Sequence, residues 1–285
     1  MQLIETIAEM KAWSRAARVS GATIGFVPTM GYLHEGHLSL MREAQAHADK
    51  LVVSIFVNPT QFGPNEDLAK YPRDLPRDTE LCASVGVDAI FLPTPAMMYP
   101  DGYNTYVNVE NLTSGLCGFS RPTHFRGVTT VVLKLFNIVD PDVAAFGCKD
   151  YQQLQVIKRM VTDLNLDLKI LEGPTVREAD GLAMSSRNKY LTAEQRGHAL
   201  VLSKSLSLAH ELYAAGERDP QVIVAAVKDL IGATPQCMID YVELVDAQNL
   251  SAITTLAKPA VLALAVKVGS TRLIDNTVLG EPECR

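Results

Sequence analysis

Short apolar segments alternate with amphipathic segments through the first part of the chain, and this alternation constrains the fold more than any other feature. The apolar segments are typical of buried strands and comprise residues 23–27, 51–57, 89–92 and 143–146. Apolar residues at helical spacing predict helices over residues 36–48, 77–85, 128–139 and 151–163. The alternation indicates an α/β fold with a Rossmann-like, mostly parallel sheet and helices on both faces. Ligands of such sheets bind outside the carboxyl ends of the strands.

The sequence changes character after residue 171. Residues 173–192 are polar and contain glycine, as a loop does. Two helical segments follow, and then three strand-like segments; they comprise residues 193–215, 220–231, 238–244, 260–268 and 271–276. We therefore expect a Rossmann-like domain over 1–174 and a smaller C-terminal α+β lid domain over 175–285.

Charge, hydropathy and cysteine usage exclude several classes of protein. Lys and Arg number 26 and Asp and Glu 32, so the net charge is −6, and a mildly acidic chain is a poor candidate for binding nucleic acid. A small anionic ligand in one basic pocket remains compatible with this balance. No apolar run approaches the ~20 residues that span a bilayer. The five cysteines are scattered and form no CxxC pair, which favours reduced thiols and a cytoplasmic protein.

Residues 25–40, GFVPTMGYLHEGHLSL, form the segment that points most clearly to chemistry. A predicted strand runs through a turn into a helix that begins near Gly36, so free backbone N–H groups and the helix dipole make an anion site. His34 and His37 are three residues apart and can both donate to phosphate oxygens. Alternatively, the pair simply caps the helix. The spacing differs from the HExxH zinc signature, and neither GxGxxG nor a Walker A lysine follows the first strand.

Two further segments place polar side chains just after predicted strands. After residues 143–146, Lys149 offers a point charge for a phosphate, Asp150 either caps a helix or binds a ribose, and Gln153 lies one turn further on. After residues 51–57, Asn58 and Gln61 are suited to reading hydroxyl and carboxylate groups, unless Asn-Pro merely forms a turn.

The predicted interdomain loop carries two hydroxyl groups and a guanidinium at Ser185, Ser186 and Arg187. Arginine can bind two phosphate oxygens at once, so this segment suits a lid that closes on phosphates. An ordinary solvated loop is the alternative interpretation.

Taken together, these segments resemble one family. PTMGYLHEGHLSL, FVNPTQFGPNEDLAKYPR, SRPTHFRGV, FGCKDYQQL, DGLAMSSRNKYL and LIDN occur in order along nearly the whole chain. The chain is similar to the pantoate–β-alanine ligases, members of the HIGH-motif nucleotidyltransferase superfamily. Two positions depart from the family pattern, because Cys117 and Cys148 stand where an acidic residue is common.

The resemblance implies an enzyme, a carbon–nitrogen ligase that condenses (R)-pantoate with β-alanine through a pantoyl adenylate, releasing AMP and diphosphate. ATP is implied as a substrate with Mg²⁺ carried mainly by its phosphates, together with a cytoplasmic homodimer that binds neither nucleic acid nor membrane. Catalytic roles are implied for His37 as proton donor, His34, Lys149 and Arg187. Another nucleotidyltransferase of the superfamily, or a non-catalytic nucleotide sensor, is the alternative.

The resemblance also implies a set of binding residues. Gln61, Gln153 and Asn58 would bind pantoate or β-alanine. Val176 would meet the adenine through its backbone, and residues 184–187 correspond to the KMSKS-like loop. The complete set implied for ATP is Met30, Gly31, Tyr32, Leu33, His34, Glu35, Gly36, His37, Gly147, Cys148, Lys149, Asp150, Val176, Met184, Ser185, Ser186 and Arg187. No protein ligand of a metal is expected.

Overall fold

The computed structural model describes residues 1–64 and 66–280, which pack as two compact units. The first unit comprises Met1–Glu110, Arg121–Gly147 and Val156–Gly173. The second comprises Asn111–Ser120, Cys148–Gln155 and the chain from Pro174 onward. The second unit thus includes two segments that precede residue 174, and the division into domains 1–174 and 175–285 stays a prediction.

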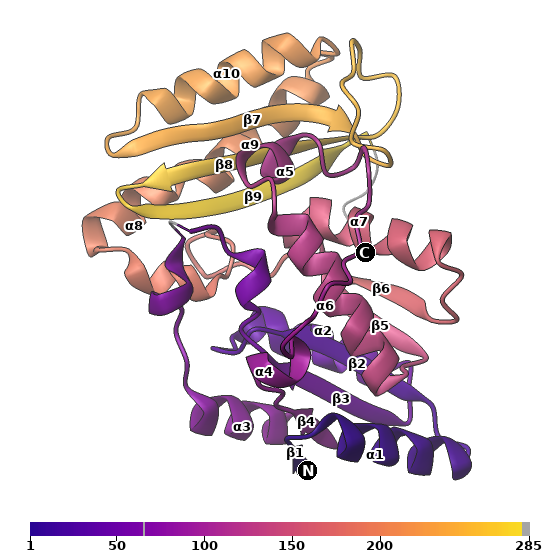
Figure 1. The fold of residues 1–285 in the computed structure, drawn as a ribbon. Coiled ribbons are helices and arrows are strands. Elements are labelled where there is room, and N and C mark those ends of the chain that lie inside the picture. The colour runs from indigo at the N-terminus through magenta and orange to yellow at the C-terminus, as the bar shows by residue number, and fades with distance from the viewer. Residues whose placement is uncertain (65, 281–285) are drawn as a thin grey trace. The chain divides into compact units, whose positions relative to one another are not determined.

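A six-stranded parallel sheet forms the centre of the first unit (Figure 1). Its order is β1-β4-β3-β2-β5-β6, with bounds β1 (Gln2–Ile4), β2 (Ile24–Thr29), β3 (Lys50–Ile55), β4 (Ala89–Phe91), β5 (Val143–Gly147) and β6 (Lys169–Gly173). Apart from the edge strand β1, the chain order runs outward in both directions from the neighbours β2 and β5, which makes this pair the topological switch point. The predicted α/β fold is confirmed, and β1 and β6 are additions to the four predicted strands.

Helices cover both faces of this sheet. Successive residues of a strand point to opposite faces: Val27 joins a core cluster with Leu38 and Met41 of α2, whereas the ring of Phe26 packs edge-on against Phe136 of α6. The helices and 3₁₀ turns in this part of the chain are α1 (Ile7–Val19), α2 (Glu35–Gln45), η1 (Pro59–Gln61), η2 (Asp67–Lys70), α3 (Leu75–Ser84), α4 (Pro95–Met98), α6 (His124–Val139) and α7 (Tyr151–Asp163).

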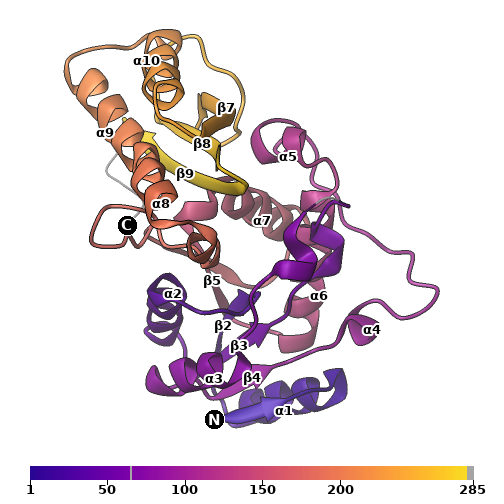
Figure 2. The same cartoon turned by 90° about the vertical axis from the view of Figure 1, so that its left-hand side faces the viewer.

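The second unit is built on an antiparallel sheet of order β7-β8-β9 (Figure 2). Its elements are α5 (Leu116–Ser120), η3 (Cys148–Asp150), η4 (Ser186–Tyr190), α8 (Ala193–Ala199), α9 (Val201–Ala214), α10 (Pro220–Gly232), β7 (Cys237–Asp246), β8 (Ala260–Val268) and β9 (Thr271–Leu279). Leu262 and Leu264 of β8 pack with α9 and α10, and Val261 and Ala263 pack with Leu116 on the other face. The smaller α+β portion is confirmed, although the helix predicted over 193–215 is divided at Leu200 into α8 and α9.

The cysteines differ from the sequence expectation at one position. Cys82, Cys117 and Cys237 are free thiols. Cys148 is disulfide-bonded, so the expectation of reduced thiols is wrong for this residue, and Cys284 lies outside the described residues. Within residues 1–64 and 66–280, no helix combines the length and apolar character that crossing a membrane requires.

Candidate active site

Strand β2 ends in a tight turn that leads into helix α2. Gly31 has a φ of +81°, and a Cβ there would lie 2.9 Å from Ile55 Cγ2 and 3.0 Å from Asp78 Oδ2. Both the conformation and the space therefore require glycine. Thr29 Oγ1 ties the turn to the neighbouring strand, because it accepts the N–H of Gly31 (3.2 Å) and donates to the Ser54 carbonyl (2.8 Å).

Asp78 of α3 is the buried acceptor that shapes this turn. Its side chain accepts the N–H groups of Tyr32 and Leu33, each at 2.7 Å, and the residue is only 1% exposed. Burial raises the pKa of Asp78, and the two backbone N–H groups oppose that rise. Arg77 donates to the Leu33 carbonyl at 2.9 Å. The backbone between the end of β2 and the start of α2 is thus held by α3.

His34 and His37 stand at the start of α2, as the sequence predicts. His34 is the N-cap residue, and its backbone N–H donates to His37 Nδ1 at 3.3 Å. A backbone N–H can only donate, so neutral His37 carries its proton on Nε2. The two ring centroids lie 4.1 Å apart. The hydrogen bond from the His34 N–H to the His37 ring supports the capping interpretation. The same hydrogen bond makes Nε2 of His37 a donor.

Three other residues predicted to bind ATP in this segment have their own contacts. The side chain of Leu33 lies in the core cluster of the first unit. Glu35 pairs with Arg42 at 2.5 Å, and the Arg77 guanidinium lies 5.3 Å from the centroid of the Tyr32 ring. Any contact of Leu33 with a nucleotide would therefore involve its backbone.

Asn58 and Gln61 follow β3 in the short turn η1, and both are buried. Asn58 Nδ2 donates to Gln61 Oε1 at 3.1 Å, and Gln61 Nε2 donates to Met30 Sδ at 3.0 Å. The structure thus brings Met30, which follows β2, into contact with Gln61, which follows β3. Asn58 also accepts the N–H of Thr60 at 3.4 Å, so the predicted turn on Asn-Pro is present as well.

The motif SRPTHFRGV contributes a clamp on the backbone of Gln61. Arg121 Nη2 donates to the Gln61 carbonyl at 3.1 Å, and His124 Nδ1 donates to the same oxygen at 2.9 Å. Arg121 also forms two hydrogen bonds to the Glu66 carboxylate. Burial alone would raise the pKa of Glu66, but the hydrogen bonds and charge of Arg121 outweigh it and lower the pKa.

In the second unit, Asn276 of β9 holds the turn that carries Lys149. Asn276 Nδ2 donates to the carbonyls of Lys149 (2.7 Å) and Cys148 (3.1 Å). Gln152 is buried and bonds to the backbone of residues 112, 115 and 117, whereas its neighbour Gln153 is half-buried. The side chain of Gln152 is thus used inside the protein, and substrate binding by Gln153 stays a prediction.

The predicted lid loop is a hydrogen-bonded structure. The N–H of Met184 donates to the Val176 carbonyl at 3.0 Å, and Arg177 forms two hydrogen bonds with Asp275, at 2.7 and 3.0 Å. Ser185 Oγ accepts the N–H of Arg187 at 3.3 Å and begins the turn η4. This segment is therefore more ordered than the solvated loop of the alternative interpretation.

The predicted residues are distributed over both units. The first unit holds those of the turn and α2 together with Asn58, Gln61 and Gly147, which ends β5. The second holds the remainder, namely Cys148, Lys149, Asp150, Gln153, Val176, Met184, Ser185, Ser186 and Arg187. Their roles toward ligands stay predictions.

Comparison with known proteins identifies the family. The family model described as pantoate–β-alanine ligase matches residues 2–278. The chain belongs to this family. It is 62% identical over 281 residues to the pantothenate synthetase of Pelotomaculum thermopropionicum, covering 99% of this chain and 100% of the relative.

Two solved structures support the assignment of the chain to this ligase family. The pantothenate synthetase of Thermus thermophilus has a TM-score of 0.91 and 43% identity, with 97% of this chain and 98% of that chain covered. The pantoate–β-alanine ligase of Francisella tularensis, solved in complex with beta-gamma ATP and β-alanine, has a TM-score of 0.80 and 35% identity, with 97% of each chain covered. The resemblance inferred from the motifs is therefore confirmed.

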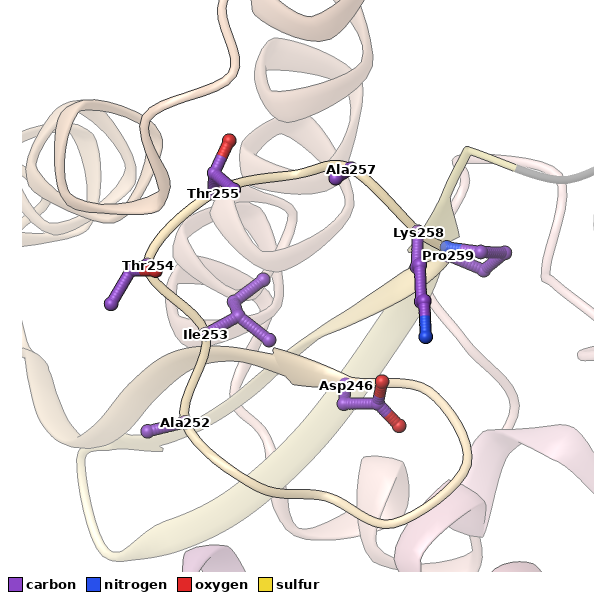
Figure 3. Close-up of a pocket in the computed structure, with 8 residues that line it drawn as sticks. All are labelled: Asp246, Ala252, Ile253, Thr254, Thr255, Ala257, Lys258 and Pro259. Carbon is purple, nitrogen blue, oxygen red and sulfur yellow. The ribbon is translucent and has the colours of Figure 1, made fainter.

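None of the predicted ligase residues lines the pocket that the structure shows in the second unit. It is lined by the connection between β7 and β8, including Asp246 and Lys258 (Figure 3). Asp246 Oδ1 accepts the N–H groups of Gln248 and Asn249 at 2.9 and 3.0 Å, so this carboxylate stabilises its own loop.

Sequence reasoning missed Asp78 and assigned no role to Arg121, His124 or Asn276. Asp78 carried a usable signal, because it lies four residues before Cys82 on the buried face of α3. A buried acid on an apolar helix face requires hydrogen-bond partners. Arg121, His124 and Asn276 lie in quoted motifs, but their partners are far away in sequence.

Proposed function

We propose that this chain joins pantoate to β-alanine in two steps, as its family membership indicates. The pantoate carboxylate attacks the α-phosphorus of ATP, and diphosphate leaves. The amine of β-alanine then attacks the acyl carbon of the pantoyl adenylate, and AMP leaves with the oxygen that linked it to the acyl group. The first step needs positive groups and fixed geometry, because a carboxylate and a triphosphate repel each other.

The observation that carries this proposal is the hydrogen bond from the His34 N–H to His37 Nδ1, which determines the tautomer of neutral His37. The N–H of His34 occupies Nδ1, so Nε2 presents a hydrogen at the N-terminus of α2, where the helix dipole favours an anion. Next to the switch point of the sheet, such a donor suits a leaving diphosphate whose charge develops in the transition state. His34 would contact the phosphates beside it. The N–H groups of Tyr32 and Leu33 are already bound to Asp78, which favours Gly36 as the place where phosphate approaches the backbone.

We assign the remaining roles by residue type and position. Gln61 would bind pantoate and touch β-alanine, and Gln153 would bind pantoate. Lys149 and Arg187 would neutralise phosphate charge, Ser185 and Ser186 would assist, and Asp150 would bind the ribose. The adenine would meet the backbone of Val176. In this scheme, 1–174 binds nucleotide and pantoate, and 175–285 acts as a lid.

Magnesium would enter with ATP and take most of its ligands from the phosphates. The described part of the chain contains no group of three or more His, Cys, Asp or Glu residues that could hold a metal ion. We further propose a cytoplasmic homodimer, on the family resemblance alone; light scattering tests the oligomeric state.

Pantoate-dependent exchange of labelled diphosphate into ATP, with β-alanine omitted, tests the first step. We expect exchange that requires pantoate, because the adenylate forms reversibly before the amine is needed. ATP binding without exchange, and without pantothenate formation when β-alanine is added, would favour the nucleotide sensor. Exchange that is independent of pantoate would favour another nucleotidyltransferase.

A further inference from the structure

The side-chain amide of Asn58 has no hydrogen-bonding capacity left for a substrate. Its Nδ2 donates to Gln61 Oε1 and to the Gly127 carbonyl, both at 3.1 Å. Its Oδ1 accepts from the Tyr99 hydroxyl (2.7 Å), the Thr60 hydroxyl (3.0 Å) and the Thr60 N–H (3.4 Å). Asn58 is 1% exposed, so every donor and acceptor it has is used inside the protein.

The partners of Asn58 also fix which way its amide points. The Gly127 carbonyl can only accept and the Thr60 N–H can only donate, so Nδ2 faces the first and Oδ1 the second. The group of Gln61 that meets Nδ2 must then be its oxygen. Gln61 therefore directs Nε2, a donor of two hydrogens, toward Met30 and the turn before α2. A donor in that position is matched to the carboxylate or hydroxyl oxygens of a substrate.

We infer that Tyr99 is a positioning residue for pantoate, acting through Asn58 on the amide orientation of Gln61. This inference rests on the proposed function, in which Gln61 binds pantoate. The Tyr99 hydroxyl makes the shortest of the hydrogen bonds to Asn58 and reaches it from a segment 41 residues away, just after α4. Without it, Asn58 Oδ1 depends on Thr60 alone, and the orientation of both amides becomes less strongly fixed.

The surroundings of Tyr99 keep its hydroxyl in the donor form and its ring in place. Burial raises the pKa of Tyr99 to about 12, so the phenol stays protonated in the neutral range. Its ring packs edge-on against that of Tyr103, with centroids 5.1 Å apart. Tyr99→Phe would therefore remove the hydroxyl and leave this packing. Tyr103→Phe is the matched control, since Tyr103 belongs to the same stack but lies outside the Asn58 network.

The test is steady-state kinetics of both variants as full-length proteins, with pantoate, ATP and β-alanine varied in turn. We expect Tyr99→Phe to lower kcat/KM for pantoate about 3- to 10-fold, the loss of one hydrogen bond, mainly by raising the pantoate KM. The KM for ATP should stay within twofold, and Tyr103→Phe should resemble the wild type. Thr60→Val, which removes the second hydroxyl from Asn58, should show the same pantoate-specific change.

Two results would overturn the inference. One is a Tyr99→Phe enzyme with an unchanged pantoate KM. The other is an equal rise in the KM for pantoate and for ATP, which would indicate a general structural loss. A wild-type protein without pantoate-dependent activity would instead overturn the proposed function, and the inference with it.

Discussion

Replacing Asp78 with asparagine should loosen the turn before α2 without changing the volume of the side chain. Asp78 accepts two backbone N–H groups at 2.7 Å and is 1% exposed. Asparagine keeps one acceptor and turns an N–H₂ group toward the other backbone N–H. Hydrogen bonds to charged groups contribute about 1.5–3 kcal/mol each, and relief of the buried charge offsets part of that loss. We expect a net destabilisation of about 2 kcal/mol.

Activity should fall with stability, because the same turn carries the backbone into His34 and His37. A displacement of about 1 Å in a reacting group can cost about 10²-fold in rate, and we expect diphosphate exchange to fall by about 10- to 100-fold. Urea denaturation followed by circular dichroism and the exchange assay measure the two effects. Asp74→Asn is the matched control: Asp74 caps the same helix by accepting the N–H of Arg77 at 3.3 Å, and asparagine caps a helix about as well as aspartate. An Asp78→Asn protein as stable and as active as the Asp74→Asn protein would refute the reasoning.

Three further predictions concern the catalytic donor, the clamp on Gln61 and the turn of Lys149. His37→Ala should lower kcat by about 10²–10³ and leave the pantoate KM within a few-fold, since the donor acts on charge that develops in the transition state. Glu66 has a lowered pKa in the folded protein, so its ionised form stabilises the fold by about 1 kcal/mol. This stabilisation is present above the ordinary pKa of 4.5 and is lost as the pH falls through the lower folded value. Thermal unfolding measured from pH 7 to pH 3 should therefore show wild type losing more stability than Glu66→Gln. Asn276→Leu should raise the KM for ATP about 3- to 10-fold, because two hydrogen bonds to the backbone at Lys149 are lost.

Each of these predictions has an outcome that contradicts it. Equal losses in pantoate binding and in rate for His37→Ala would remove its role as transition-state donor. Parallel pH profiles for wild type and Glu66→Gln would show that the ion pair with Arg121 does not stabilise the fold. An unchanged KM for ATP in Asn276→Leu would separate the turn at Lys149 from nucleotide binding.

The central strands could be predicted because their apolar, β-branched residues form a local pattern. Strands β2 and β3 carry five buried residues and four, respectively. The pattern does not predict strand β1, because three residues give no period. It does not predict β6, because Lys169 and Glu172 leave only two consecutive apolar residues between them. The break between α8 and α9 was missed since apolar periodicity continues across Leu200.

The candidate site could be predicted only as far as neighbours in sequence reveal it. His34 and His37 lie on one helical turn, and Asn58 and Gln61 on another, so their spacing is informative. The residues that position them act over long separations: Asp78 bonds to Tyr32 over 46 residues and Tyr99 to Asn58 over 41. Periodicity cannot report such contacts, because they depend on how the sheet brings α3 and the segment after α4 to the ends of β2 and β3.

The same limit explains the role given to Asn58. A position just after a strand is expected both for a residue that touches the ligand and for a residue that orients a ligand-binding neighbour. Only the five hydrogen bonds of its amide distinguish the two cases. We therefore propose that Asn58 orients Gln61 and does not itself bind the substrate.

The most direct test of the proposed reaction follows one oxygen atom. Pantoate labelled with ¹⁸O in its carboxylate is converted to product with ATP and β-alanine, and the AMP is analysed by mass spectrometry. Attack of the carboxylate on the α-phosphorus, followed by attack of the amine on the acyl carbon, leaves one labelled oxygen in AMP. We predict AMP that carries a single ¹⁸O atom for each pantothenate formed. Unlabelled AMP, or label recovered in inorganic phosphate, would contradict the acyl-adenylate route.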